Sequence, residues 1–263
     1  MHIVVTLKQV HDPNTPAERL VLGADGKSLT NPAGVSDVAN GYDVNAVEEA
    51  LKIREAVGGS VTVLGVGSEA LKAHLRRAIA MGADKAIHVE GAGGIDSDPA
   101  PVAAMLAAAI RTLPSVDLVL CGRQSSDTDN GQVLFRLAEQ LGLSAVSPVK
   151  RMVEVAEGSV HVERLTDDGV QRVRSALPVL LGISNEANKP RSPSLKGVMS
   201  SKKAEIPTVK LADLGVELPA PSMVLRRVYF PEVSAARAEM VSADDGAAAG
   251  RALAERLHEE GVI

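Results

Sequence analysis

Short apolar runs repeat between Met1 and Gly142, and a helical pattern follows each of them. We expect strands at 2–7, 61–66, 85–89 and 117–121, and helices at 40–57, 68–82, 97–113 and 134–141. The runs lack polar alternation, which is typical of strands covered on both faces. Strands and helices that alternate at short intervals form a parallel sheet with helices on both sides. The sequence therefore predicts an α/β fold with a mostly parallel, doubly wound sheet.

The pattern changes after Gly142. An antiparallel meander is predicted at about 149–176 by three strand-like segments and two turn signals: 149–155, Glu157-Gly158, 160–165, Asp167-Asp168-Gly169 and 170–176. Another apolar strand is expected at 177–183. We therefore assign residues 1–187 to one α/β domain that includes an antiparallel extension.

The remaining residues are irregular. Residues 188–204 are rich in proline, serine and basic side chains, which predicts an exposed loop. Residues 205–263 alternate short apolar pieces with prolines and close with an alanine-rich helix at 242–261. This C-terminal arm is too apolar for a disordered tail and too interrupted to build its own core. We expect it to lie against a partner or against its own domain.

Several polar residues stand where the predicted helices begin. The expected capping residues are Asn40 or Asp43 for the first helix, Ser68 for the second, Ser97 or Asp98 for the third, and Asp129 or Asn130 for the fourth.

The composition excludes several classes of protein. A net charge of −5, with acidic and basic residues interspersed, argues against a nucleic-acid binder. The single cysteine, Cys121, excludes an internal disulfide framework and fits a reducing compartment, and we expect it to be a buried apolar residue. The histidines lack metal-ligand spacing, so no metal is expected. The chain has no apolar run of membrane-spanning length and no signal-peptide pattern at its start, so we expect a cytoplasmic protein that is not inserted in a membrane.

A polar loop follows the expected strand at 117–121. Eight side chains in it can form hydrogen bonds: Gln124, Ser125, Ser126, Asp127, Thr128, Asp129, Asn130 and Gln132. Open α/β sheets bind ligands at the carboxyl ends of buried strands, so this loop is a candidate binding site. The alternative is a solvated turn that caps the following helix.

Catalytic motifs are sparse. Gly65, Gly67 and Ala70 match the GxGxxA dinucleotide pattern, with Glu90 near the end of the next strand, so an NAD-dependent oxidoreductase is one alternative. A strand-to-helix turn also needs glycines for backbone reasons alone. The chain lacks a Walker phosphate loop, a GxSxG elbow and an HExxH motif. The polar groups therefore predict binding rather than an enzyme that makes bonds.

The sequence resembles the β subunits of electron-transfer flavoproteins over nearly its whole length. The resemblance is carried by VTLKQVHD, NGYDVNAVEEALKIRE, RRAIAMGADKAIHV, GRQSSDTDNGQV, LPVLLGISNEANKPRSPSLKGVMSSKK and KLADLGV. It implies an α/β fold related to the adenine-nucleotide hydrolases and a heterodimer whose α subunit holds most of the redox FAD. It also implies an electron carrier between flavoprotein dehydrogenases and an acceptor such as a quinone oxidoreductase. A stand-alone adenine-nucleotide sensor of the same superfamily is the other alternative.

The resemblance also implies a nucleotide site. It falls on Thr6, Asn40, Val66 and the loop Gln124, Ser125, Ser126, Asp127, Thr128, Asp129, Asn130, Gly131 and Gln132. Its occupant is AMP or a second FAD. Asp127 and Asp129 would repel phosphate, so we expect them to hold the backbone N–H groups of the loop itself. Tyr42 lies where the family places an aromatic side chain against the flavin of the α subunit; otherwise it is a packing residue at a helix start.

A docking site is implied in the loop 188–204. There Leu195 is the apolar anchor for the partner dehydrogenase, and it is accompanied by Lys196, Met199, Lys202 and Lys203. The alternative is a flexible basic loop with an incidental leucine. The resemblance further implies that the C-terminal arm, 205–263, packs on the α subunit.

Overall fold

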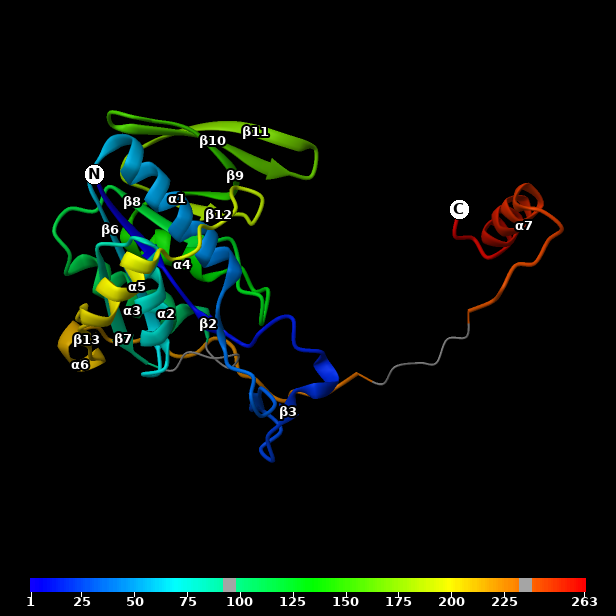
Figure 1. The fold of residues 1–263 in the computed structure, drawn as a ribbon, viewed down its shortest axis with the longest axis horizontal. Coiled ribbons are helices and arrows are strands. Elements are labelled where there is room, and N and C mark those ends of the chain that lie inside the picture. Colours follow the sequence, from blue (N-terminus) through cyan, green and yellow to red (C-terminus); the bar gives the residue numbers. More distant parts are fainter. Residues whose placement is uncertain (92–97, 232–237) are drawn as a thin grey trace. The chain divides into compact units, whose positions relative to one another are not determined.

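The computed structural model describes residues 1–91, 98–231 and 238–263 (Figure 1). The chain forms two compact units, Met1–Tyr229 and Phe230–Ile263. Ser97, one of the residues expected to cap the third helix, lies outside the described residues.

A nine-stranded sheet forms the centre of the first unit, in the order β11-β10-β9-β12-β8-β1-β6-β7-β13. The strands that pair only in parallel are β1 (His2–Thr6), β6 (Ser60–Gly67), β7 (Lys85–Glu90), β8 (Leu118–Gly122), β12 (Val179–Ile183) and β13 (Thr208–Val209). From β1 the chain continues to β6 and β7 on one side and later returns to β8 on the other. The predicted α/β fold with a mostly parallel, doubly wound sheet is confirmed.

Helices cover both faces of this sheet. One face carries α1 (Gly41–Val57), α2 (Leu71–Met81) and α5 (Leu195–Lys203), and the other carries α3 (Pro99–Arg111), α4 (Val133–Leu141) and α6 (Leu211–Leu214). Val5 of β1 belongs to the core with Leu51 of α1, whereas Val4 belongs to the core with Leu106 of α3. Successive residues of β1 thus point into opposite cores, because side chains alternate along a strand.

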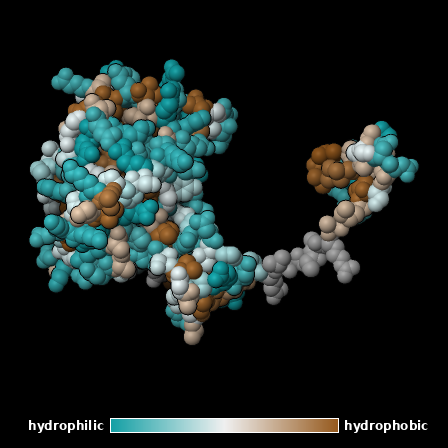
Figure 2. All heavy atoms as spheres, viewed as in Figure 1, coloured by the Kyte–Doolittle hydropathy of each residue, from teal (hydrophilic) through white to brown (hydrophobic). Residues whose placement is uncertain are grey.

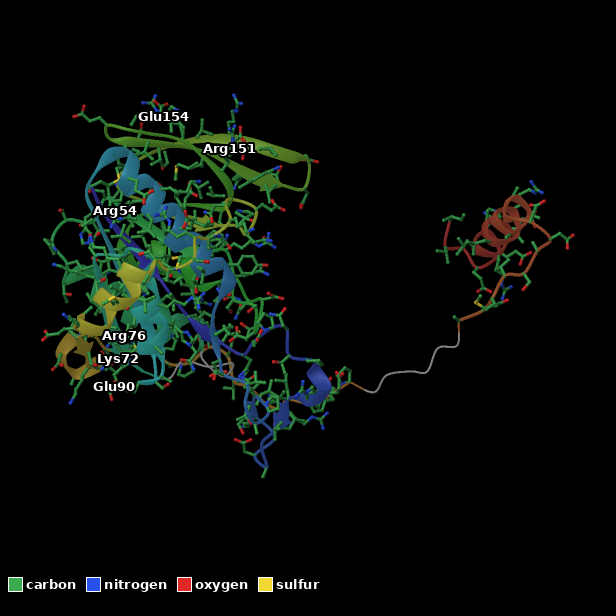
Figure 3. All side chains as sticks on the ribbon, viewed as in Figure 1. Arg54, Lys72, Arg76, Glu90, Arg151 and Glu154 are labelled. Atoms are coloured by element: carbon green, nitrogen blue, oxygen red, sulfur yellow. The ribbon has the colours of Figure 1, made fainter. Side chains whose placement is uncertain are left out.

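The antiparallel extension is built from β9 (Ser144–Ala156), β10 (Ser159–Thr166) and β11 (Gly169–Ala176). β9 pairs in parallel with β12 along its first residues and antiparallel with β10 further on, so it begins before the expected start at 149. Its charged residues include Arg151 and Glu154 (Figure 3). Arg151 forms a two-point ion pair with Glu163 at 2.9 and 2.8 Å.

The segment between β1 and α1 forms small elements where the sequence predicted only a polar loop. They are β2 (Gln9–Val10) paired with β5 (Val38–Ala39), β3 (Val21–Leu22) paired with β4 (Leu29–Thr30), and the short 3₁₀ turn η1 (Ala17–Arg19).

Three of the four expected helix caps do not form, because Asn40 stands at the N-cap position of α1 without a side-chain cap hydrogen bond and the caps of α2 and α4 differ. Helix α2 begins at Leu71, and Ser68 contributes its backbone carbonyl to the Leu71 N–H rather than its hydroxyl. Helix α4 begins at Val133 after Gln132, not after Asp129 or Asn130. The third expectation is confirmed, because the Asp98 carboxylate accepts from the Ala100 N–H at 2.7 Å. Sequence alone did not reveal that the loop before α4 uses its polar side chains for other contacts.

The expected loop 188–204 is helical in its second half. Helix α5 begins after Ser194, whose hydroxyl accepts from the Gly197 N–H at 3.0 Å. At Gly197 the helix lies so close to α2 that a β-carbon would stand 2.1 Å from the Ala80 carbonyl oxygen. Arg76 of α2 (Figure 3) donates to the carbonyl oxygens of Ser201 and Ala204 at the end of α5. The prediction of a loop was therefore wrong for 195–203. The close contact at Gly197 and the hydrogen bonds from Arg76 stabilise a helix there.

The C-terminal arm divides between the two units. Its first part joins the sheet, where Thr208 of β13 pairs with His88 of β7, and α6 packs on α3. The second unit contains α7 (Gly246–Glu259), which Asp245 caps by accepting from the Ala248 N–H. Figure 2 shows apolar surface on this unit, where Leu253, Val262 and Ile263 are exposed. The arm thus packs on its own domain over the stretch up to Tyr229, and its packing on an α subunit stays a prediction.

Candidate functional site

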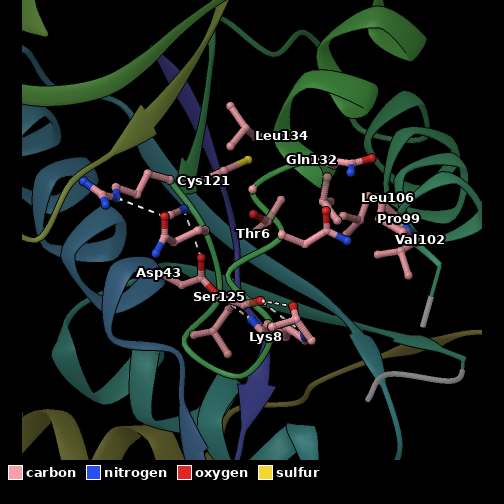
Figure 4. Close-up of a pocket in the computed structure, with 18 of the residues that line it drawn as sticks. Thr6, Lys8, Asp43, Pro99, Val102, Leu106, Cys121, Ser125, Gln132 and Leu134 are labelled. Atoms are coloured by element: carbon pink, nitrogen blue, oxygen red, sulfur yellow. Dashed lines mark hydrogen bonds between the residues drawn. The ribbon is translucent and has the colours of Figure 1, made fainter. Parts of the chain in front are cut away.

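A pocket lies at the carboxyl ends of β1 and β8 (Figure 4). These two strands are neighbours, but the chain leaves β1 toward β6 and leaves β8 toward β12 and β9. The connections therefore diverge between them, and open α/β sheets bind their ligands at this kind of switch point. Including the part open to solvent, the pocket has a volume of about 790 Å³.

The pocket has an apolar wall and a polar rim. The wall is formed by Val66, Pro99, Val102, Leu106, Cys121 and Leu134. The rim is formed by Thr6, Lys8, Gln124, Ser125, Thr128, Asn130 and Gln132. In Figure 4 the α3 residues Pro99, Val102 and Leu106 stand across from Asp43, with Thr6 of β1 between them. Such a site suits a ligand with a flat apolar group at one end and hydrogen-bonding or anionic groups at the other.

Asn40 holds the polar loop from outside the pocket. It is almost fully buried at the N-cap position of α1, and its side-chain amide donates to the Gln124 carbonyl oxygen at 2.8 Å. Its side-chain oxygen accepts from the Ser126 N–H at 3.2 Å. Asn40 therefore joins the loop to the start of α1 instead of capping that helix with its side chain.

The two loop carboxylates bind side chains, which corrects the expectation that they hold backbone N–H groups. The Lys8 ammonium lies 2.9 and 2.7 Å from the two oxygens of Asp127. Asp129 accepts from the Gln124 side-chain amide at 2.7 Å. Asp129 has a φ of 49°, a left-handed conformation that aspartate tolerates better than most residues. The sequence could not pair Asp127 with Lys8, which lies far away along the chain.

Asp43 bridges the two strand ends. One of its carboxylate oxygens accepts from the Lys8 N–H at 2.8 Å, and the other accepts from the Gly122 N–H at 3.0 Å. Burial raises the pKa of the Asp43 carboxyl to about 6, although these hydrogen bonds oppose the rise. Burial also raises the pKa of the neighbouring Cys121 thiol to about 12, so the expected buried cysteine stays a neutral thiol.

The pocket brings together most of the residues that the sequence singled out. Thr6, Val66, Gln124, Ser125, Thr128, Asn130, Gly131 and Gln132 line it. Asn40, Ser126, Asp127 and Asp129 lie around the loop, and Tyr42 stacks under the Arg123 guanidinium 5.5 Å from its ring centre. Sequence reasoning missed Lys8 and the α3 wall, and it considered Asp43 only as a helix cap. The one signal for Lys8 was its place directly after the first predicted strand.

The docking residues lie elsewhere, on α5. Leu195 and Met199 are one helical turn apart, with 79% and 65% of their surfaces exposed. Lys196, Lys202 and Lys203 belong to the same helix. Ser201 is buried on the side of α5 that faces α2. The helix thus presents an apolar patch with basic neighbours to the outside.

The GxGxxA glycines have a packing role. A β-carbon on Gly65 would stand 2.2 Å from the Leu7 carbonyl oxygen, and one on Gly67 would stand 3.2 Å from the Leu71 side chain. Strand β6 ends at Gly67 and helix α2 begins at Leu71, directly after Ala70, so the motif forms the turn from strand to helix. The close contacts account for both glycines without a dinucleotide.

Two further observations concern the described residues alone. Within the three described ranges, no helix combines the length and apolar character that a membrane crossing needs. Among the same residues, no three side chains of His, Cys, Asp or Glu gather closely enough to hold a metal ion.

The sequence is similar to proteins of known families. The family model for the electron transfer flavoprotein domain matches residues 31–214. The chain is 38% identical over 221 residues to a protein of Mycobacterium tuberculosis named electron transfer flavoprotein subunit beta, covering 82% of this chain and 81% of the relative. It is 33% identical over 270 residues to the protein FixA of Azorhizobium caulinodans, covering 97% of this chain and 93% of the relative.

Proposed function

This chain belongs to the electron transfer flavoprotein family, among the β subunits and FixA proteins, and we propose that it forms a heterodimeric electron carrier with an α subunit. The observation that carries the proposal is the combination of this similarity with a pocket of apolar wall and polar rim at the switch point of the sheet. The chain would carry electrons from flavoprotein dehydrogenases to a quinone oxidoreductase or another acceptor, without making bonds of its own.

The pocket is the proposed site for an adenine nucleotide, either AMP or the adenine half of a second FAD. Its residues fit such a group. The apolar wall of Val66, Val102 and Leu106 offers a surface for the adenine ring, and Gln124, Ser125 and Thr128 offer amide and hydroxyl groups to ribose and phosphate. The Lys8 ammonium at the rim neutralises Asp127, so the loop presents less negative charge to a phosphate than its sequence implies.

The redox FAD is proposed to lie mostly on the α subunit, where its isoalloxazine ring would supply the electron transfer. This chain would shield and orient that flavin through residues near the start of α1. Tyr42 is the candidate contact. The stack of Arg123 on its ring supports this role, because it fixes the orientation of the ring beside the pocket.

The exposed face of α5 is the proposed docking site for the donor dehydrogenase. Leu195 would insert as the apolar anchor, with Met199 beside it. The basic residues Lys196, Lys202 and Lys203 would attract an acidic rim on the partner. The anchor would then mainly set the dissociation rate, whereas the charges would steer the encounter.

Co-expression with the α subunit encoded in the same organism tests the proposal. We expect a yellow complex, and mass spectrometry of the denatured complex should find FAD together with AMP, or FAD alone in twice the amount. A chain that retains AMP but never binds an α subunit would point to a stand-alone nucleotide sensor. A chain that retains neither nucleotide nor partner would overturn the proposal.

A further inference from the structure

The ladder between β1 and β8 stops before the pocket. The two strands pair at Ile3↔Leu118, Val4↔Val119 and Val5↔Leu120. Beyond this point the Asp43 carboxylate links the two segments, because its oxygens accept from the Lys8 and Gly122 N–H groups at 2.8 and 3.0 Å. A carboxylate of another element therefore spans the opening between the strand ends.

The opening is built around this carboxylate. A β-carbon on Gly122 would stand 2.5 Å from one Asp43 oxygen and 2.7 Å from the Tyr42 β-carbon, so a larger residue would displace the bridge. Asp43 lies in the first turn of α1, where the partial positive charge of the helix N-terminus favours an anion. Each oxygen already has a backbone donor, so the carboxylate is engaged with the protein itself.

The bridged residues form part of the pocket. Thr6, Leu7 and Lys8 line it from the β1 side, and Gly122, Arg123 and Gln124 line it from the β8 side. A change in the separation of the Lys8 and Gly122 backbones would therefore move both sides of the pocket. Lys8 would also carry its ammonium group away from Asp127 and the polar loop.

We propose that Asp43 is a positioning residue for the nucleotide site: its carboxylate fixes the separation of the β1 and β8 ends and so holds the pocket at the width that binds the ligand. The inference rests on the proposed nucleotide-binding function. Asp43 itself lines the pocket, but its two oxygens accept from the Lys8 and Gly122 N–H groups. It therefore acts through these two residues and does not bind the phosphate, which its charge would repel.

Asp117 provides a matched control. Its carboxylate accepts from the His2 N–H at 2.7 Å and so bridges the same two strands at their amino ends, away from the pocket. Both residues are aspartates that hold a backbone N–H at or just beyond one end of β1. Loss of either carboxylate weakens the same strand pair, but only loss of Asp43 acts at the pocket.

The experiment compares Asp43→Asn and Asp117→Asn in the complex with the α subunit. Bound nucleotide is removed, and AMP and FAD are each titrated back by calorimetry, with thermal unfolding measured in parallel. We expect Asp43→Asn to weaken binding of the parent's nucleotide by about 10-fold, since one of two hydrogen bonds to a charged acceptor is lost. Asp117→Asn should bind within about 2-fold of the parent, even if its melting temperature falls as much as that of Asp43→Asn.

Other outcomes are equally decisive. If Asp43→Asn binds like the parent, or if both variants lose affinity in proportion to their loss of stability, the positioning role is wrong. If Asp43→Asn does not fold, Asp43→Glu retains the charge but shifts the oxygens by one methylene, and parent-like binding by that variant would overturn the inference. A parent complex that binds neither AMP nor FAD would instead overturn the proposed nucleotide site, and this inference with it.

Discussion

The backbone N–H and the guanidinium Nε of Arg191 both donate to one carboxylate oxygen of Glu48, at 3.0 and 2.9 Å. The Arg191 guanidinium also pairs with Glu55, which lies about two turns further along the same face of α1. Next to it, the Asn45 side chain donates to the Asn188 carbonyl oxygen at 2.8 Å. The segment that leads into α5 is therefore fastened to α1, so the exposed face of α5 is held in a defined place.

Arg191→Met should destabilise the protein. Glu48 is almost fully buried and would lose its main ion-pair and hydrogen-bond partner, so we expect the free energy of unfolding to fall by about 2 kcal/mol. Urea unfolding measures this loss. The control is Arg151→Met, which should cost less because Arg172 still pairs with Glu163 and the pair is at the surface. Equal losses in the two variants would show that the Arg191 contacts are no stronger than an ordinary surface pair.

Leu195→Ala should slow electron transfer from the physiological dehydrogenase by at least about 10-fold, because an anchor side chain in a partner's pocket contributes more than about 2 kcal/mol to binding. Flavin content and reduction by small artificial donors should stay unchanged, since Leu195 is exposed and is not among the residues that line the pocket. Stopped-flow kinetics provides the measurement. Val170→Ala on the exposed β11 strand is the control, and parent rates for Leu195→Ala with every dehydrogenase tested would refute the docking role.

Lys8→Met should lower stability more than Asp127→Asn. The Asp127 side chain is 4% exposed, so removing the ammonium leaves a buried carboxylate without its partner, whereas the Lys8 side chain is 29% exposed and can reach water when Asp127 is neutralised. We expect a difference of about 1–2 kcal/mol in the free energy of unfolding. Lys8→Met should also weaken nucleotide binding more, because it removes a cation from the pocket rim. The reverse order in chemical denaturation would contradict the pairing.

Asp43 should make the stability of the protein depend on pH. Its pKa is about 6 in the folded protein against 3.8 for the free carboxyl, so folding favours the protonated form. This contribution is complete below the unfolded pKa and is lost as the pH rises through about 6, with a total of up to about 3 kcal/mol. The neighbouring Cys121 thiol does not titrate in this window, because burial raises its pKa to about 12.

The measurement compares the parent with Asp43→Asn, which lacks this titration, by urea unfolding between about pH 7.5 and pH 4.5. The contributions of other titrating groups are the same in both proteins, so they cancel in the difference in the free energy of unfolding. The stability of the parent relative to the variant should rise as the pH falls. A difference that stays constant across this window would mean that Asp43 is not a buried titrating carboxyl.

The sequence by itself determined the fold class and the place of the polar loop. The runs at 2–7 and 117–121 predicted strands that are covered on both faces, because period and composition are local properties of the chain. The same local reasoning placed Gln124, Ser125 and Gln132 at a strand end, where the pocket lies. It also predicted the meander, since its turn signals are contiguous residues.

Tertiary structure alone decided which side chains meet at the pocket and which segment becomes a helix. Asp43 meets Gly122 from 79 positions away, and Lys8 meets Asp127 from 119 positions away, so no local spacing encodes either pair. Helix α5 forms in a stretch whose composition predicts a loop, because Gly197 lets it pack closely on α2 and Arg76 binds its last carbonyl oxygens. Contacts of this kind depend on how the helices and strands pack, and that packing is set by residues far apart in the sequence.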